Sequence, residues 1–205
     1  MSVLVRELLK GKRVVLGSQS PRRRELLHLL TDDFEVQPSQ CEEIVPEGVP
    51  AVEVPICLAE QKCRDVVSRC QPDDNTIVIG CDTVVILRDE ILGKPKDEED
   101  AFRMLSSLCA ETHQVVSGLC VWYKGRYHTS YDDAWVTFSA HTDEELRYYI
   151  STGEPMDKAG AYGIQELGGL LASNVDGDYN SIVGLPVNEL STVICSILGD
   201  ENGDP

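Results

Sequence analysis

A run of three arginines at positions 22–24 follows Ser18, Ser20 and Pro21, where an apolar segment gives way to a leucine-rich one. The first turn of a helix carries unpaired backbone N–H groups and the positive end of the helix dipole, so native side chains there are usually acidic. Serine hydroxyls, free N–H groups and guanidinium groups all donate hydrogen bonds to phosphate oxygens. The pattern therefore predicts an anion site, although three solvated arginines covering a helix surface would give the same residues.

Asp82 interrupts an apolar run of β-forming residues that extends from Thr76 to Leu87. An ionised carboxylate inside such a strand is unfavourable unless a cation, a hydrogen-bond network or a metal ion compensates it. We therefore interpret Asp82 as a general base or a metal ligand. The alternative is a carboxylate that caps a neighbouring turn, with Gly80 marking a β-bulge.

Two further polar stretches have suitable chemistry to act with Asp82. The segment ILGKPKD (91–97) places two lysines beside a rigid proline, and a lysine held in this way is a suitable point charge for a phosphate oxygen. Glu42 and Glu43 form either a solvated acidic surface or part of a metal site. The chain contains neither the GxxxxGK[ST] spacing of a P-loop nor a GxGxxG fingerprint.

The charge balance restricts the partners. The chain has 35 acidic and 18 basic residues and a formal net charge of -17, which repels nucleic acids and anionic membranes but allows a small anion in a locally basic site. No long apolar run or signal-peptide pattern occurs, so we expect a cytoplasmic protein whose eight cysteines are reduced thiols. The spacing of cysteines and histidines argues against structural zinc, so any metal is expected to be a hard ion on carboxylates.

The polar residues must be positioned by alternating strands and helices. Length and even composition favour one α/β domain over residues 1–198 with a flexible tail over 199–205. Ser20 is the expected N-cap of a helix that buries Leu26, Leu27, Leu29 and Leu30. The other patterns predict strands at 13–16, 76–87, 115–123 and 127–139, and helices at 54–70, 98–108, from Thr142 to Gly153, and at 186–198.

Several ordered blocks together resemble the Maf family of nucleoside triphosphate pyrophosphatases, which share a fold with the inosine triphosphatase group. The blocks are GSQSPRRRELL (17–27), LAEQK (58–62), GCDTVVIL (80–87), ILGKPKDEEDAFRML (91–105), HQVVSG (113–118), GEPMDKAGAYGIQ (153–165) and VGLPV (183–187). The resemblance covers nearly the whole chain. It implies a mixed, twisted sheet with flanking helices, two lobes around a central cleft, and a homodimer.

The resemblance also implies the reaction and its residues. The expected reaction is hydrolysis between the α and β phosphates of a nucleoside triphosphate, with Asp82 as proton acceptor and with Glu43 (or Glu42) and Asp82 holding a divalent cation, Mg²⁺ or Mn²⁺. The residues expected to bind phosphate are Ser18, Ser20, Arg23, Lys62 and Lys94, of which Lys94 is also counted as catalytic. The residues expected to select the base are Arg22, Thr83 and Gln165, and their combination resembles the branch that acts on dTTP and UTP.

General chemistry agrees with that expectation. Attack on a phosphoanhydride needs cationic donors over several oxygens, an oriented water and a nearby base. A Gln amide presents a donor and an acceptor side by side, which matches O4 and N3–H of uracil or thymine. Members of the family that the chain resembles commonly have a glycine where this chain has Glu166. This departure leaves the base specificity open. The alternatives are a 7-methyl-GTP or broad-range pyrophosphatase, and a nucleotide sensor without catalysis.

Overall fold

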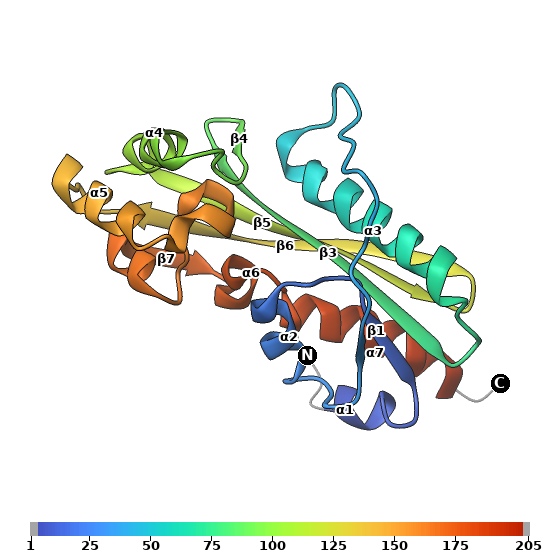
Figure 1. Ribbon diagram of the computed structural model, residues 1–205. Helices are drawn as coiled ribbons and strands as arrows, with labels where there is room; N and C mark the ends of the chain where they lie inside the picture. Colours follow the sequence, from blue (N-terminus) through green and yellow to red (C-terminus); the bar gives the residue numbers. More distant parts are fainter. Residues whose placement is uncertain (1–3, 203–205) are drawn as a thin grey trace. The chain divides into compact units, whose positions relative to one another are not determined.

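The computed structural model describes the backbone of residues 4–202 and side chains up to residue 199. Over this range the chain is a mixed α/β protein with a seven-stranded sheet and helices packed around it (Figure 1). The strands are β1 Arg13–Leu16, β2 Glu35–Val36, β3 Thr76–Leu87, β4 Glu90–Leu92, β5 Thr112–Tyr123, β6 Arg126–Phe138 and β7 Ala172–Gly177. Their order is β2-β1-β3-β5-β6-β7, with β4 paired to β3.

The described helices differ widely in length. The α-helices are α1 Val5–Leu8, α2 Pro21–Leu27, α3 Val54–Cys70, α4 Glu98–Leu108, α5 Asp143–Ser151, α6 Tyr179–Val183 and α7 Val187–Asn202. The 3₁₀ helices are η1 Ala51–Glu53, η2 Glu154–Asp157, η3 Ala159–Ala161 and η4 Leu167–Leu171. No helix among residues 4–202 is both long enough and apolar enough to cross a bilayer.

The chain divides into two compact units. Within the described residues, unit 1 comprises 4–82, 117–132 and 184–202, and unit 2 comprises 83–116 and 133–183. The long strands β3, β5 and β6 each contribute residues to both units. Residues 82 and 83 therefore belong to different units although they are neighbours in β3.

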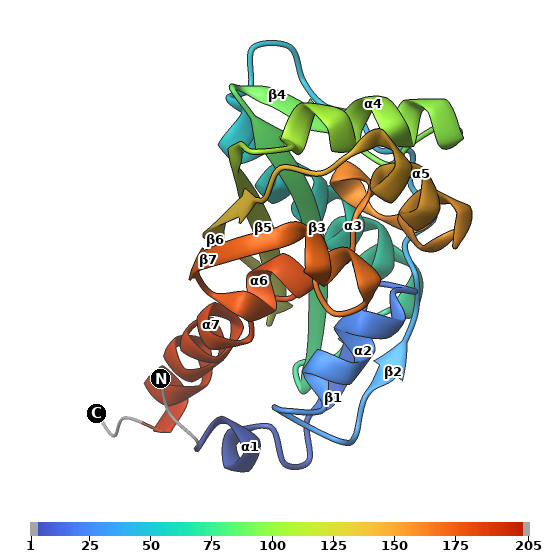
Figure 2. The same cartoon turned by 90° about the vertical axis from the view of Figure 1, so that its left-hand side faces the viewer.

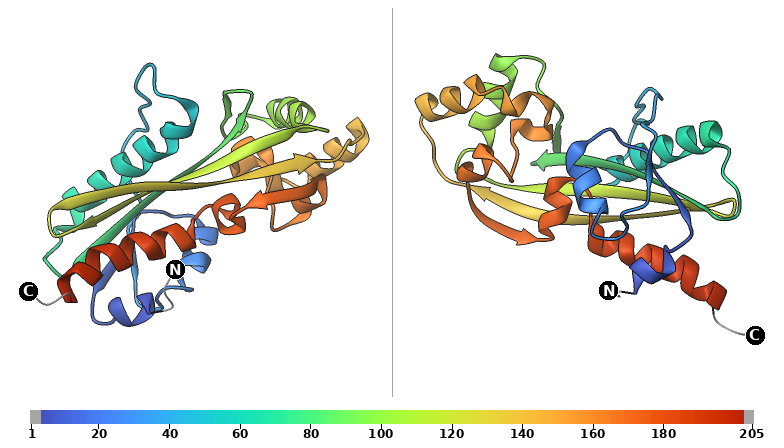
Figure 3. Two further views of the ribbon diagram at one scale, coloured as in Figure 1. Left: turned by 180° about the vertical axis from the view of Figure 1, so that it is seen from behind. Right: turned by 60° about the horizontal axis from the view of Figure 1, so that its bottom comes forward.

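In unit 1, β1 pairs in parallel with β2 and with β3. Helix α3 lies very close to the sheet, because a Cβ at Gly80 would come within 2.3 Å of the Ala59 carbonyl oxygen, and one at Gly118 within 2.3 Å of the Pro55 carbonyl oxygen. Only glycine allows this approach, so the close helix contact accounts for the glycine at position 80. Helices α1 and α7 pack together in the same unit (Figure 3).

In unit 2, β3 pairs with β4 and β6 pairs with β7, both antiparallel. Helices α4 and α5 lie side by side (Figure 2) and bury residues such as Leu105, Leu108 and Leu146 in one apolar cluster. Helix α5 begins with the predicted capping box, in which Thr142 and Glu145 exchange hydrogen bonds. The cap fixes where this helix starts.

The structure confirms the predicted bounds of β1, α3, β3 and α4. The two strands are apolar runs of β-forming residues, and the two helices have one apolar face. The structure corrects other bounds. Helix α2 ends at Leu27, so Leu29 is 56% exposed and not buried as predicted. Helix α7 continues past Leu198 to Asn202, and the rest of the predicted tail, 203–205, lies outside the described residues. The sequence did not predict α1, α6, β2 and β4, which are short, or β7, which is mostly exposed and carries no apolar pattern.

Candidate active site

Three charged side chains of unit 1 form a cluster in which the Asp82 and Glu43 carboxylates both contact the Lys62 ammonium. The Lys62 ammonium forms a short ion pair with Asp82 Oδ1 and lies 2.8 Å from Glu43 Oε1. The side chains of Asp82 and Lys62 are only 11% and 15% exposed, whereas that of Glu43 is 54% exposed. Lys62 comes from α3, Asp82 from the middle of β3, and Glu43 from the irregular segment before α3. The residue that contacts Lys62 is Glu43, and this contact distinguishes Glu43 from its neighbour Glu42.

Glycine at position 80 makes this contact possible. Gly80 lies two residues before Asp82 on the strand, and Ala59, which it touches, lies one helical turn before Lys62. Residues three apart share one face of a helix, so the approach at Gly80 also brings Lys62 onto the sheet. The apolar residues Ala59, Cys63 and Val66 bury the same face of α3. The packing of the helix therefore places the ammonium beside the carboxylate.

Burial and charge act in opposite directions on this pair. Burial raises the pKa of Asp82 above its ordinary value, and the positive charges of Lys62 and Arg23 oppose that rise without cancelling it. Burial acts to lower the pKa of Lys62, but the charge of Asp82 and the hydrogen bonds to Asp82 and Glu43 outweigh it and raise that pKa. Lys62 thus stays charged, and Asp82 is a stronger proton acceptor than an exposed carboxylate.

Hydrogen bonds hold the Arg23 side chain beside the same strand. Its Nε donates to the Gly184 carbonyl oxygen at 2.7 Å, and its Nη1 donates to the Cys81 carbonyl oxygen at 2.9 Å and to Ser18 Oγ at 3.3 Å. Ser18 Oγ also accepts the backbone N–H of Ser20 at 3.2 Å. These bonds tie the loop before α2, the centre of β3 and the segment before α7 to one guanidinium group.

The helix start differs from the expectation in two ways. Helix α2 is short, so its dipole is weak, and Ser20 is the N-cap by position but makes no capping bond with its side chain. The sequence predicts a negatively charged group beside the arginines. Backbone carbonyl oxygens that accept hydrogen bonds from Arg23 take part of that place. Arg22 is half-buried and Arg24 is exposed. At this predicted anion site the oriented group is therefore the guanidinium of Arg23, more than the helix end.

The predicted residues fall into two groups. Unit 1 holds Glu43, Asp82 and the predicted phosphate ligands Ser18, Ser20, Arg23 and Lys62, together with Arg22. Unit 2 holds Thr83, Lys94 and Gln165. Thr83 is half-buried in β3, Lys94 is exposed after β4, and Gln165 is exposed in the turn before η4. The functional roles of all these residues remain predictions.

The carboxylates of unit 1 fit the donor set of a magnesium-type ion. Asp82 and Glu43 both approach one ammonium nitrogen, so they already converge on a single position for positive charge. Mg²⁺ in nucleotide enzymes usually takes one or two carboxylates and completes its shell with water and phosphate oxygens. Among the described residues no cluster of three or more metal-binding side chains occurs, so the protein alone would not enclose the ion.

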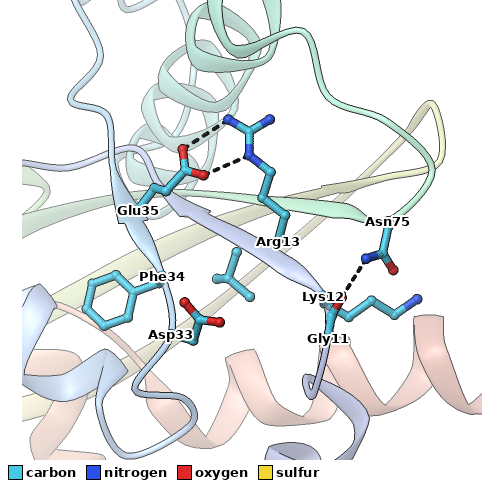
Figure 4. A pocket seen from close by; sticks show the side chains of 8 residues that line it. Gly11, Lys12, Arg13, Asp33, Phe34, Glu35 and Asn75 are labelled. Atoms are coloured by element: carbon cyan, nitrogen blue, oxygen red, sulfur yellow. Dashed lines mark hydrogen bonds and ion pairs between the residues drawn. The ribbon is translucent and has the colours of Figure 1, made fainter.

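A cavity of about 310 Å³ elsewhere in unit 1 has different chemistry (Figure 4). It lies at the amino end of β1, where Arg13 forms two 2.9 Å bonds to Glu35 and Asn75 donates to the Gly11 carbonyl oxygen at 2.6 Å. Its most polar groups are thus paired with one another. Ser18 instead follows the carboxyl end of β1, the end at which parallel sheets generally bind ligands.

Comparison with known proteins identifies the family of the chain. A family model described as Maf-like protein matches residues 13–197. The chain belongs to the Maf family. Three similar Maf relatives are each named dTTP/UTP pyrophosphatase. They come from Bacillus velezensis (46% identical, over 86% of this chain and 92% of the relative), Bacillus pumilus (44%, over 88% and 94%) and Porphyromonas gingivalis (44%, over 89% and 92%).

Membership of the Maf family confirms the resemblance drawn from the ordered blocks. The sequence analysis nevertheless missed two features of this Maf protein. It gave no role to Gly184, whose carbonyl oxygen accepts from Arg23, although the block VGLPV (183–187) was part of the resemblance. Lys62 was predicted to bind phosphate alone, whereas in the structure it also joins Glu43 to Asp82.

Proposed function

We propose that this Maf protein hydrolyses dTTP and UTP to the nucleoside monophosphate and pyrophosphate, and so removes these nucleotides or modified pyrimidine nucleotides from the pool. The observation that carries the proposal is the buried Asp82 carboxylate, which is paired with Lys62 and lies in the field of Arg23. The names of the relatives support the same reaction and the same substrates.

In the proposed reaction Asp82 accepts a proton from the attacking water. The water oxygen forms a new bond to phosphorus, the phosphoanhydride bond between the α and β phosphates breaks, and pyrophosphate leaves. The raised pKa of Asp82 suits this role, because a base with a pKa closer to the working pH takes a proton more readily. Lys62 keeps the carboxylate oriented through its ion pair with Oδ1.

Cationic side chains would neutralise the triphosphate. Arg23 is already oriented by its bonds to backbone oxygens and Ser18, and Lys62 and Lys94 add point charges. Glu43 and Asp82 would hold a Mg²⁺ or Mn²⁺ ion, which when bound supplies further charge neutralisation at the phosphate oxygens. Oriented charge of this kind accounts for most of the catalysis in phosphoryl transfer.

Base selection is assigned to Arg22, Thr83 and Gln165. The Gln165 amide pairs with O4 and N3–H of uracil or thymine, whereas cytosine presents donor and acceptor in the opposite order. We also propose that the protein is cytoplasmic and forms a homodimer. It binds neither nucleic acid nor membranes. Sedimentation of the purified protein tests the dimer.

The deciding experiment measures pyrophosphate release from dTTP, UTP, CTP and 7-methyl-GTP with Mg²⁺ or Mn²⁺. We expect release from dTTP and UTP well above the others, and none after the metal is chelated. Fastest release from 7-methyl-GTP, or equal release from every nucleotide, would replace the proposed specificity. Tight nucleotide binding without any pyrophosphate would instead indicate a sensor.

A further inference from the structure

The loop that carries Gln165 is anchored on both sides by one carboxylate and one hydroxyl. Glu154, at the start of η2, accepts the backbone N–H of Leu167 through Oε2 at 3.1 Å and that of Gly168 through Oε1 at 3.1 Å. Both N–H groups lie just after Gln165 in the chain. The carboxylate of Glu154 therefore fixes the carboxyl-terminal side of the loop.

Tyr149 of α5 anchors the other side. Its hydroxyl donates to Glu154 Oε1 at 2.8 Å and accepts the backbone N–H of Gly163 at 3.2 Å. One hydroxyl thus connects the residue two positions before Gln165 to the carboxylate that holds the residues after it. The side chain of Tyr149 belongs to the apolar core of unit 2 and is buried, so the anchor itself is rigid.

Two glycines allow the loop backbone to reach these anchors. A Cβ at Gly168 would lie 2.5 Å from the Tyr149 hydroxyl oxygen, and one at Gly163 would lie 2.6 Å from Cε of Lys158. Neither contact is possible for a real side chain, so only glycine fits. Lys158 is itself held, since its ammonium donates to the Glu154 carbonyl oxygen at 2.6 Å and to Asp157 at 2.9 Å. The loop is packed against fixed groups on each side of Gln165.

Gln165 itself is exposed, in contrast to the groups that hold its backbone. A long amide side chain on a mobile loop would sample many positions and discriminate poorly between bases. Specificity requires donors and acceptors held within a fraction of an ångström by a supporting layer of hydrogen bonds. The loop 163–168 has such a layer in Glu154 and Tyr149, neither of which the sequence analysis assigned.

We propose that Glu154 and Tyr149 are positioning residues that hold the Gln165 loop in place and thereby set the preference for uracil and thymine. This inference rests on the proposed function. Neither residue needs to touch the nucleotide, because each acts through the backbone of the loop. The substrate class that the loop selects is the pyrimidine triphosphates with a 4-keto group.

The variants Glu154→Gln and Tyr149→Phe test the inference, and the chain offers a matched control for each. Glu154→Gln removes one negative charge, as Glu144→Gln does at an exposed position of α5. Tyr149→Phe removes one hydroxyl. Tyr148→Phe does the same at the preceding residue, which is 71% exposed. The milder Tyr149→Phe keeps the inference testable if Glu154→Gln folds poorly.

The first measurement needs no substrate. We expect the backbone N–H groups of Gly163, Leu167 and Gly168 to exchange hydrogen about tenfold or more faster in both test variants than in the two controls. Unchanged exchange in the test variants would overturn the anchoring itself. This result is independent of whether the protein hydrolyses nucleotides.

The second measurement is the ratio of kcat/KM for UTP to that for CTP and for GTP. We expect the test variants to lose up to about fivefold of the preference for UTP, the loss expected when the Gln165 side chain is removed, through a higher KM and with kcat for UTP nearly unchanged. An equal loss for all three nucleotides, together with a lower Tm, would reduce Glu154 and Tyr149 to supports of the fold and overturn the inference. A wild-type protein that releases no pyrophosphate from UTP would overturn the proposed function, and hydrogen exchange would still decide the anchoring.

Discussion

Unit 1 and unit 2 both bury ionisable side chains, but they favour different charge states. In unit 1, Asp82 and Glu43 raise the pKa of Lys62 and keep the ammonium charged. In unit 2, burial lowers the pKa of His113 to about 4 and raises that of Tyr162, so both stay neutral, joined by a 2.8 Å hydrogen bond. The buried cluster around Lys62 is thus suited to meet a charged group, whereas the buried His113–Tyr162 pair is held in a neutral form.

The physical reason for the difference is the presence or absence of a partner charge. Lys62 has two carboxylates within reach, which compensate for its loss of water. His113 packs edge-on against the rings of Phe138 and Tyr162, and burial alone accounts for its lowered pKa. A polyphosphate needs the first environment, whereas a nucleobase, which carries no charge, needs only the second. If this comparison is right, a change at Asp82 should alter turnover, whereas changes at His113 and Gln165 should alter pH stability and base preference.

The largest effect is expected for Asp82→Asn. The amide cannot take the proton, so kcat should fall by about 10² to 10⁴-fold while the preference between UTP and CTP stays the same. Steady-state kinetics and circular dichroism measure the two quantities. Asp74→Asn, at an exposed position of the same unit, is the control. Turnover close to that of the wild type would remove Asp82 from the mechanism.

Lys62→Met is expected to destabilise unit 1 and to make its stability depend more strongly on a metal ion. Removing one partner of a buried pair leaves an uncompensated charge, so the free energy of unfolding should fall by about 3 to 5 kcal/mol. Mn²⁺ should restore more stability to this variant than it adds to the wild type, because the ammonium no longer competes for Asp82 and Glu43. Urea unfolding with and without Mn²⁺ measures both effects.

The control for that measurement is Lys10→Met, which removes a lysine that is 70% exposed and pairs with Glu7 on the surface. Surface pairs contribute little, so its stability should match the wild type with or without the ion. If Mn²⁺ stabilises all three proteins equally, the ion does not bind at the position that Lys62 holds.

The pH dependence of unit 2 should follow His113. Its pKa is about 4 in the folded protein and 6.5 ordinarily, so the unfolded chain binds the proton first as pH falls. Stability is therefore fully present above pH 6.5 and is lost between pH 6.5 and 4, by about 3 kcal/mol. His113→Gln should remove this part of the pH dependence, which the wild type keeps. Equal slopes of stability against pH for the variant and the wild type in urea unfolding would contradict the assignment.

The smallest effect is expected for Gln165→Ala. Loss of one pairing of about 1 kcal/mol should lower the preference for UTP over CTP roughly fivefold, with kcat for UTP nearly unchanged. Leu170→Ala, an exposed change in the same glycine-rich segment, is the control. A fall in kcat as large as that of Asp82→Asn would contradict the separate roles of Asp82 in turnover and of Gln165 in base preference.

The sequence alone determined the regular elements and the family. The apolar run from Thr76 to Leu87 predicted a buried strand, and Asp82 is the single carboxylate in it. A continuous run of β-forming residues is typical of a strand buried on both faces, and a 3.6-residue period is typical of a helix with one buried face. The prediction failed at Leu29, where the helix ended one turn early, and at the two- and three-residue strands, which have no period to read.

Only the tertiary structure decided which side chains meet. The sequence left Glu42 and Glu43 open, and the contact of Lys62 with Glu43 depends on how the irregular segment lies against α3. The tie from Arg23 to Gly184 joins residues 161 positions apart. Glu154 anchors its loop through backbone N–H groups, which every non-proline residue carries, so no residue type could reveal the contact. Periodicity reports burial, whereas long-range pairing depends on how separate segments pack.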